Sequence, residues 1–167
     1  MQSAGSISSG EEIFLNRKYI EADKRITLGF IEPHFFAGFS GGPKAIMPGI
    51  ASITNIKNFH SFDMIDNHRA TWGILDNNPL QIMATESALL VKPHFSINVT
   101  LTPDHKITGF FCGDIIDAHR EGAAFAKELS MTGFDSRFDI VITSNSGYPL
   151  DRNFYQTVKG ICAAGEI

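Results

Sequence analysis

The sequence Ile26-Thr-Leu-Gly-Phe-Ile-Glu-Pro-His-Phe-Phe-Ala-Gly-Phe-Ser-Gly-Gly-Pro-Lys44 is the stretch of this chain that says most about its fold. It begins as an apolar run, residues 26–31, which is typical of a buried strand. The run leads into a glycine-rich loop, where the missing side chains let the backbone approach a ligand closely. His34 precedes this loop, Lys44 lies within it, and His60 follows on the next segment. Together they supply a proton acceptor, a nucleophile and a metal ligand, which core packing alone would not require.

Outward from this stretch, strand-like and helix-like segments alternate along the chain. Strands are expected over residues 13–15, 24–31, 95–101, 106–112 and 138–143. Helices are expected over residues 79–91 and 152–164, and from Asp114 or Asp117 through Leu129. A further helix, capped by Ser52 or Thr54, is expected to carry Ile56, Phe59, His60 and Met64. This order predicts an α/β fold with a mixed, partly parallel sheet flanked by helices.

The last part of the chain predicts an incomplete domain organisation. The strand expected at residues 138–143 and the helix after it have too little sequence behind them to form a domain. The chain also stops where a next strand would begin. We therefore expect a fragment, with residues 1–130 as the C-terminal part of one domain and residues 131–167 as a linker and the first strand–helix unit of a second.

Composition argues against several classes of function. The formal net charge of -4 disfavours non-specific nucleic-acid binding, which needs a basic surface. No apolar run approaches the roughly 20 residues that a membrane helix needs. The Ser/Gly-rich start, Met1 to Gly10, lacks the basic and apolar regions of a secretory signal. Cys112 and Cys162 stand far apart, which predicts two reduced and mostly buried thiols in a cytoplasmic protein.

Two familiar motifs fit the glycine-rich loop poorly. Residues 38–42 match the G-x-S-x-G pattern of hydrolases, but that pattern needs a sharp strand-to-helix turn, and several residues separate Ile31 from Ser40. The phosphate loop of nucleotide triphosphatases needs Ser or Thr after Gly-Lys, whereas here a proline precedes the lysine and an alanine follows it. A weaker prediction remains, that an anion is cradled by free backbone N–H groups of Ser40, Gly41 and Gly42.

Each candidate side chain also has an ordinary structural explanation. His34 could simply hydrogen-bond at a strand end, Lys44 could be solvated, and His60 could be a buried histidine whose hydrogen bonds are satisfied. A functional role is favoured because one loop can draw all three together. The other histidines show no spacing typical of ligands and are expected to be structural or at the surface: His68, His94, His105 and His119.

The stretch from Glu32 to Ala51, followed by His60 and by Tyr155-Gln156-Thr157-Val158-Lys159, closely resembles the nickel-dependent lactate racemase family. The similarity extends over nearly the whole chain. In that family a pyridinium-thioamide-thiocarboxylate mononucleotide forms a pincer around nickel. The resemblance implies that Lys44 is joined covalently to this cofactor through the thioamide, and that residues 1–130 belong to the domain that tethers it.

The resemblance also implies roles for other residues. His60 falls on the nickel ligand of the family, and His34 falls on a catalytic histidine. A planar nickel site accepts soft sulfur donors and one imidazole, so a single protein ligand suffices when the cofactor supplies the others. The binding residues implied are Ser40, Gly41, Gly42, Tyr155 and Lys159 for the cofactor, and Tyr155, Gln156 and Lys159 for the substrate.

The reaction that the resemblance implies is racemisation or epimerisation of a 2-hydroxy acid. Lactate is the default substrate, and a larger 2-hydroxy acid or a sugar epimer is the alternative. Hydride would move from the substrate to the pincer while a histidine takes the hydroxyl proton, and the transient 2-keto acid would take hydride back on either face. The family's second catalytic histidine and a substrate-binding arginine lie upstream of the matched region. We therefore expect the chain alone to be inactive or badly impaired.

Two other classes of function stay open at this stage. One is a cofactor-binding or anion-binding module without turnover of its own. The other is a metal hydrolase built on His34 and His60, which would bind zinc without a lysine adduct. The partners expected for the racemase are a small 2-hydroxy acid and the enzymes that synthesise the cofactor, with a homo-oligomer as an option and with neither nucleic acid nor a membrane.

Overall fold

The computed structural model describes residues 1–145, 147–149 and 151–167, and the side chain of Tyr155 lies outside this description. The chain divides into two compact units, Met1–Met131 and Thr132–Ile167. This division falls one residue after the expected end of the first domain. The first unit holds the glycine-rich loop together with His60.

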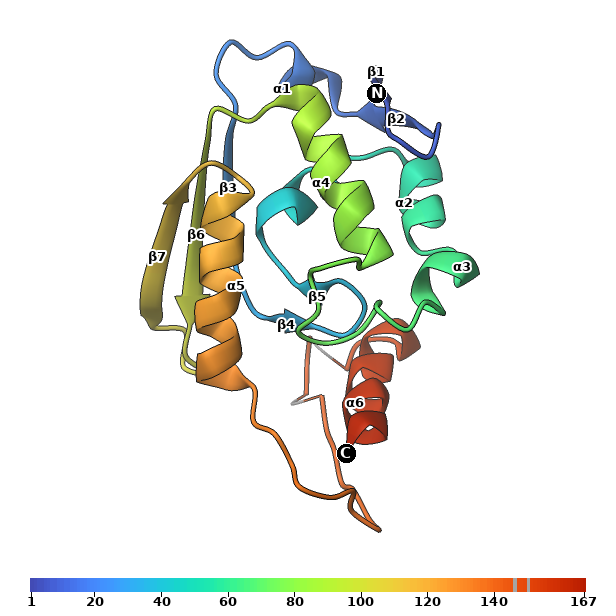
Figure 1. Ribbon diagram of the computed structural model, residues 1–167, viewed down its shortest axis with the longest axis vertical. Helices are drawn as coiled ribbons and strands as arrows, with labels where there is room; N and C mark the ends of the chain where they lie inside the picture. The colour runs from blue at the N-terminus through green and yellow to red at the C-terminus, as the bar shows by residue number, and fades with distance from the viewer. Residues whose placement is uncertain (146, 150) are drawn as a thin grey trace. The chain divides into compact units, whose positions relative to one another are not determined.

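The first unit contains a three-stranded sheet (Figure 1). Its strands are β3 (Ile26–Phe30), β6 (Phe95–Leu101) and β7 (Ile107–Gly113), in the order β3-β6-β7. β3 pairs with β6 in parallel, and β6 pairs with β7 antiparallel as a hairpin. The prediction of a mixed, partly parallel sheet is therefore confirmed, and the predicted hairpin forms.

Helix α5 (Asp117–Ser130) packs against this sheet. It contacts both β6 and β7, and Figure 1 shows it running alongside these strands. The helix approaches closely because residue 122 is glycine, and a Cβ atom there would collide with the side chain of Ile31. Ile31 packs with Ala123 and Ala126 in a small buried cluster.

The main hydrophobic core includes one face of helix α4 (Pro79–Val91). The helix starts with proline in its first position, as predicted, and Asn78 is its N-cap, with Oδ1 accepting from the Leu80 N–H at 3.0 Å. The most deeply buried apolar residues of this core are Ile13, Leu15, Ala37, Ile46, Met47, Phe59, Leu80, Ala84 and Ala88. The core therefore joins α4 to segments that lie far from it in the sequence.

Strand β1 (Gln2–Ser6) was not expected from the sequence. It pairs antiparallel with β2 (Glu12–Leu15), the strand predicted at residues 13–15. The composition of this segment did not predict a strand, because serine and glycine are not typical strand formers. Tertiary contacts hold the hairpin instead: Ile7 is buried in the main core, and the Ser8 N–H donates to the Glu86 carboxylate at 2.9 Å.

The single helix expected after residue 52 is broken at His60. Helix α2 (Ile53–Phe59) begins at the predicted cap Ser52 and ends where His60 leaves the helical conformation. Ser61 then adopts an extended backbone and starts a second helix, α3 (Phe62–Ile65). Serine favours helix starts over helix interiors because its hydroxyl competes for backbone groups. The remaining short elements of the first unit are α1 (Arg17–Ile20), β4 (Pro33–His34), β5 (Gly38–Phe39) and the 3-10 helix η1 (Gly42–Ala45).

The second unit contains helix α6 (Phe154–Glu166), which Asn153 caps. The strand expected over residues 138–143 is not formed, and this segment is irregular. A strand is stabilised by hydrogen bonds to a neighbouring strand, and the described residues of this unit include no strand to pair with it. The expected strand–helix unit is therefore a helix preceded by irregular chain.

The expectation of two mostly buried thiols is wrong for Cys112. This residue follows the buried Phe111 on β7, and successive residues of a strand face opposite sides of the sheet, so its side chain is exposed. Cys162 is half-buried, and neither thiol forms a disulfide. Among the described residues, no helix combines the length and the apolar character that crossing a membrane would require.

Asn78→Ala is expected to destabilise the first unit by about 2–4 kcal/mol, because it removes the N-cap of α4 together with buried hydrogen bonds. The Asn78 side chain also donates to the carbonyl oxygens of Phe36 and Ile74, at 2.8 and 3.0 Å. Urea unfolding followed by the fluorescence of Trp72, the single tryptophan, measures the loss.

Asn58→Ala is the matched control. Asn58 is exposed and donates to Glu11 at 3.0 Å, so its removal should change the free energy of unfolding by no more than about 0.5 kcal/mol. Equal unfolding midpoints for the two variants would contradict the assigned role of Asn78.

Candidate functional site

The glycine-rich loop folds back on itself through two very short strands, β4 and β5. Pro33 pairs with Phe39, and His34 pairs with Gly38. Gly38 has a φ of 73°, and a Cβ atom there would collide with the backbone carbonyl of Ile74. This position therefore requires glycine, and the loop has a defined, packed conformation.

Hydrogen bonds from the backbone and from the Ser40 hydroxyl hold the centre of the loop. The Ser40 N–H donates to the Glu32 carbonyl at 2.9 Å, and the Ser40 hydroxyl donates to the Phe30 carbonyl at 3.0 Å. The Gly42 N–H donates to Asn98 Oδ1 at 3.0 Å. The prediction of free N–H groups is therefore wrong for Ser40 and Gly42, because both donate within the protein.

Asn98 connects this loop to the sheet. Its Oδ1 accepts from Gly42, while its Nδ2 donates to the Ser96 hydroxyl at 2.9 Å. Thr27 on the neighbouring strand donates to the same hydroxyl at 2.9 Å. All three side chains are buried, where satisfied hydrogen bonds rigidify their surroundings. Sequence reasoning missed Asn98, and the polar residues that alternate along β6 were the available signal.

His119 is the second residue that holds the loop. It is only 3% exposed, and its Nε2–H donates to the Ser40 carbonyl at 2.9 Å. Gly42 has a φ of 51°, and a Cβ atom there would collide with the His119 ring. His119 was expected to be structural or at the surface, and the structure shows it to be structural.

The electrostatics of His119 bear on Lys44. Burial lowers the pKa of His119 to about 4. The hydrogen bond to Ser40 opposes this shift, while the positive charges of Lys44 and Arg120 add to it. The imidazole is therefore neutral at neutral pH. The Lys44 ammonium therefore lies close enough to the His119 ring for its charge to act on the imidazole.

Lys44 lies in the 3-10 helix η1, directly after the glycine pair. Its backbone N–H donates to the Gly41 carbonyl at 3.1 Å, and its side chain is half-buried. Two and three residues further on, Ile46 and Met47 are fully buried in the main core. The segment that presents Lys44 is thus anchored on both sides.

His60 closes helix α2 with a defined ring tautomer. Its Nδ1 lies 2.8 Å from the Ile56 carbonyl oxygen. A carbonyl only accepts, so Nδ1 carries the hydrogen and the neutral ring keeps its lone pair on Nε2. The side chain is half-buried beside Phe59. A metal-binding imidazole commonly has its second nitrogen held in this way, so His60 fits the predicted role of nickel ligand.

His34 has the opposite tautomer. Its Nδ1 accepts from the backbone N–H groups of Phe36 and Ala37, both at 3.2 Å. The neutral ring therefore carries its hydrogen on Nε2 and acts there as a hydrogen-bond donor. To accept a proton at Nε2, the ring must first move its hydrogen to Nδ1 and give up these two long bonds.

The three predicted site residues are carried by segments that share one core. Ala37, Met47 and Phe59 belong to the same buried cluster. They lie respectively three residues after His34, three residues after Lys44 and one residue before His60. The common core fixes the backbone on which each functional side chain stands.

The second unit carries the residues expected near the substrate. Gln156 and Lys159 stand one helical turn apart on α6 and are half-buried. Within the part of the chain that the structure describes, the Gln156 Oε1 is buried and has no hydrogen-bond partner. Tyr155 was expected beside them, and its side chain lies outside the described residues.

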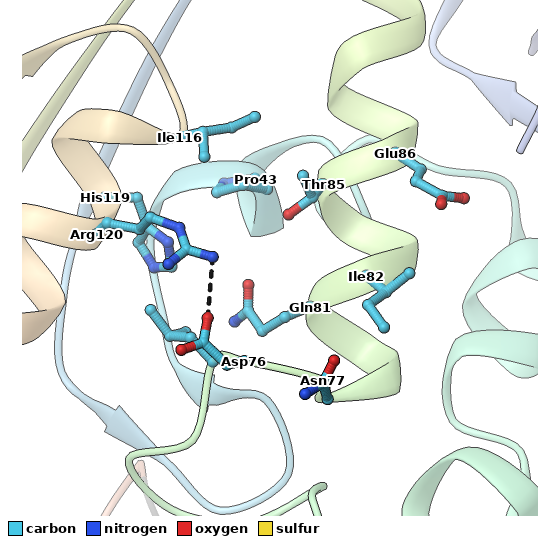
Figure 2. Close-up of a pocket in the computed structure, with 11 residues that line it drawn as sticks. Pro43, Asp76, Asn77, Gln81, Ile82, Thr85, Glu86, Ile116, His119 and Arg120 are labelled. Carbon is cyan, nitrogen blue, oxygen red and sulfur yellow. Dashed lines mark hydrogen bonds and ion pairs between the residues drawn. The ribbon is translucent and has the colours of Figure 1, made fainter. Parts of the chain in front are cut away.

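A cleft of about 600 Å³ lies between α4, α5 and the turn before α4 (Figure 2). His119 lines it, and Arg120 pairs there with Asp76 at 3.0 Å. His34, Lys44 and His60 are not among the described residues that line this cleft. The cleft therefore borders the loop at Pro43, the residue before Lys44, but none of the three predicted site side chains lines it.

No group of three or more His, Cys, Asp or Glu side chains among the described residues is placed to hold a metal ion. A typical protein zinc site uses three or four such ligands. The metal-hydrolase alternative therefore gains no support from this part of the chain.

Comparison with known families gives two matches. Residues 1–73 match the lactate racemase N-terminal domain, and residues 135–167 match the lactate racemase C-terminal domain. The chain is 44% identical to a lactate racemase of Thermoanaerobacterium thermosaccharolyticum over 163 residues, and 46% identical to one of Lactiplantibacillus plantarum over 165 residues. Each alignment covers 98% of this chain but only 38% of the relative.

Solved structures show the same relationship. The lactate racemase apoprotein from T. thermosaccharolyticum superposes with a TM-score of 0.93 at 44% identity, over 99% of this chain and 39% of that one. A protein from Thermotoga maritima superposes with a TM-score of 0.65 at 20% identity, over 76% of this chain and 36% of that one. The second likeness is one of fold alone.

His119→Gln is expected to reduce the loss of stability in mild acid. The unfolded chain binds a proton at His119 below a pH of about 6.5, whereas the folded chain does so only below about 4. The contribution of His119 to the free energy of unfolding is therefore fully present above pH 6.5. It falls by about 3 kcal/mol as the pH drops to 4.

Glutamine keeps an N–H donor for Ser40 and does not titrate, so the difference in unfolding free energy between wild type and His119→Gln isolates this residue. This difference in unfolding free energy should change as the pH falls from 6.5 to 4. Urea unfolding at a series of pH values measures it. A difference that stays constant with pH would show that His119 is not buried as a neutral imidazole.

Proposed function

Because this chain belongs to the lactate racemase family, we propose that it forms the cofactor-bearing part of an enzyme that racemises a small 2-hydroxy acid, with lactate as the default substrate. The observation that carries the proposal is a likeness of 44–46% identity over 98% of the chain. The chain spans 38% of the length of these relatives.

Lys44 is the proposed attachment point of a nickel-pincer mononucleotide. A lysine amine forms a covalent link when it is deprotonated. The packed loop supports this role because its hydrogen bonds to Asn98 and His119 hold the backbone before Lys44 in one conformation. When bound, such a group would supply a reversible hydride acceptor.

His60 is the proposed protein ligand to nickel. The hydrogen bond from Nδ1–H to the Ile56 carbonyl leaves the Nε2 lone pair for a metal. A nickel site with soft sulfur donors accepts one imidazole in addition. His60 therefore suffices as the ligand from this chain if the cofactor supplies the remaining donors.

His34 is the proposed proton-transfer residue for one face of the substrate. Inversion at C2 of a 2-hydroxy acid removes the hydroxyl proton and later returns it, and an imidazole can do both near neutral pH. In the described conformation Nδ1 accepts two backbone N–H groups, so the neutral ring carries its hydrogen on Nε2. We propose that substrate binding shifts its hydrogen to Nδ1, which the two 3.2 Å bonds resist only weakly.

The second unit is proposed to hold the substrate anion. Lys159 offers a positive charge for a carboxylate, and the buried Gln156 Oε1 is an acceptor that a substrate hydroxyl would satisfy. Tyr155 is proposed for the same site on the family resemblance alone. These three residues would bind and orient the substrate.

Lys44→Ala is expected to abolish a covalent adduct on the chain. We would produce the protein beside the enzymes that synthesise the cofactor and measure intact mass and bound nickel. His60→Ala should keep the adduct and lose at least about tenfold in nickel, since even outer-shell changes cost about 10–100-fold in metal affinity. Lys57→Ala and His68→Ala, at exposed positions, are the matched controls.

If the folded wild type has an unmodified mass, the proposed covalent link at Lys44 is wrong. Nickel bound normally by His60→Ala would reassign the metal ligand. Zinc bound without any adduct would favour the hydrolase alternative over the racemase.

Racemisation itself is tested by grafting. This chain would replace the matched stretch of the T. thermosaccharolyticum lactate racemase, and conversion of L-lactate to D-lactate would be followed by chiral chromatography. The graft should racemise lactate, and His34→Ala should lower the rate by about 10²–10⁴-fold, as expected for loss of a proton-transfer group. His68→Ala should leave the rate unchanged.

A graft that folds and carries the Lys44 adduct but does not act on lactate would refute lactate as the substrate. Equal rates for the graft with and without His34→Ala would remove His34 from the proton transfer.

A further inference from the structure

The turn between β4 and β5 is bonded to the His34 ring on one side and to the start of α4 on the other. The N–H groups of Phe36 and Ala37 donate to His34 Nδ1, both at 3.2 Å. The carbonyl oxygens of the same two residues accept from α4. Asn78 Nδ2 donates to the Phe36 carbonyl at 2.8 Å, and Gln81 Nε2 donates to the Ala37 carbonyl at 2.5 Å. The start of this helix therefore contacts the groups that hold the proposed proton-transfer residue.

A single peptide group lies between Asn78 and the His34 ring. The Phe36 carbonyl and the Ala37 N–H belong to the same peptide unit, so two hydrogen bonds in series join the Asn78 amide to His34 Nδ1. Hydrogen bonds in such a chain polarise one another, and donation to the carbonyl strengthens donation by the N–H. The bonds to Nδ1 are at the long end of the usual range, so the strength of their donors decides how firmly the ring is held.

The orientation of the Asn78 amide follows from its place at the start of α4. The side chain is fully buried, and its Oδ1 accepts from the N–H groups of Leu80 and Gln81 at 3.0 and 3.4 Å. Because an N–H only donates, the amide oxygen faces the helix. The amide nitrogen must then face the carbonyl oxygens of Phe36 and Ile74. The helix cap thus aims a hydrogen-bond donor at the turn.

Aromatic packing fixes the plane of the His34 ring. The imidazole stacks on Phe35, with the ring centroids 4.9 Å apart and an angle of 27° between the planes. Phe35 is itself buried and lies against the rings of Phe36 and Trp72. The stacking sets the ring plane, and the two backbone N–H groups set which nitrogen faces the turn.

We propose that Asn78 is a positioning residue for racemisation, which acts on His34 through the peptide between Phe36 and Ala37. It holds Nδ1 of His34 as an acceptor, so the hydrogen of the neutral ring stays on Nε2. A base that takes a substrate proton at Nε2 needs the other tautomer. Asn78 therefore stabilises the form from which the reaction departs. This role in racemisation rests on the proposed function of His34, whereas the hold on the ring does not.

The helix cap and the hold on His34 use different atoms of Asn78 and can be separated. The cap uses Oδ1, and the link to the turn uses Nδ2. Aspartate and serine are both good N-cap residues because each supplies an acceptor oxygen. Neither has the amide nitrogen that donates to Phe36. Asn78→Asp and Asn78→Ser therefore keep the start of α4 and remove the link.

The tautomer ratio of His34 is the measurement. Nitrogen-15 NMR of the ring nitrogens of this chain, at about pH 8.5 where imidazoles are neutral, gives the ratio of the Nε2–H form to the Nδ1–H form. The His34 signals are assigned by their loss in His34→Gln. We expect the Nε2–H form to predominate in the wild type. Asn78→Asp and Asn78→Ser should each lower the ratio by at least about threefold, since one net hydrogen bond corresponds to about fivefold.

Gln81→Met is the matched control. It removes two hydrogen bonds to the same turn, those from Gln81 to the carbonyl oxygens of Ala37 and Phe39. Neither carbonyl shares a peptide unit with the two N–H groups that donate to the His34 ring. This variant should lose stability and keep the wild-type tautomer ratio. The ring of His60 is the internal reference and should keep its own ratio in every variant.

Two results would overturn the proposal. An unchanged His34 ratio in whichever Asn78 variant folds would leave Asn78 as a helix cap alone. An equal fall of the ratio in Gln81→Met would show a general loosening of the turn. The ratio is measured on the chain without cofactor or substrate, so it does not depend on the Lys44 adduct or on lactate turnover. A failure of this proposal is therefore distinguishable from a failure of the proposed function.

Discussion

Two hydrogen bonds, one buried and one partly buried, hold the part of the molecule on which the proposed chemistry depends. The Gly42 N–H donates to Asn98 on the sheet, and His119 on α5 donates to the Ser40 carbonyl. The His119 ring and the Asn98 side chain are buried, and in buried surroundings a satisfied polar contact fixes geometry and a broken one is costly. They join the loop before Lys44 to the sheet and to a helix, so the lysine starts from a rigid backbone.

The same contacts also shape the electrostatics around Lys44. A carboxylate at the position of His119 would favour the ammonium form of the lysine. The buried imidazole is instead neutral, because burial lowers its pKa to about 4. It therefore supplies a hydrogen bond to the loop without a charge that opposes the amine form needed for a covalent link.

The division of the sheet into a polar and an apolar face links the site to the wider architecture. Asn98 and Ser96 turn their polar side chains toward the loop. Because side chains alternate along a strand, the neighbouring apolar residues must face the other way. Leu28 on β3 and Phe110 on β7 accordingly stand on the side of the sheet away from the loop.

Elements with strong local signals could be predicted from the sequence. Pro79 after Asn78 marks the start of α4, and Ser52 marks the start of α2. Alternating apolar residues on both sides of a turn mark the β6–β7 hairpin. The segment at residues 138–143 had a comparable signal and formed no strand, because a strand also needs a neighbour.

For the candidate site as well, some features could be predicted from the sequence and others depended on the tertiary structure. The sequence by itself determined which chemical groups are present: an amine in a glycine-rich loop, an imidazole on either side of it, and the family to which this pattern belongs. The tertiary structure alone decided which N–H groups are occupied, which histidine is buried and which ring nitrogen of His34 and His60 keeps its lone pair. The reason is distance along the chain, because the loop is held by partners 56 and 79 residues away, and only folding brings such partners within hydrogen-bonding reach.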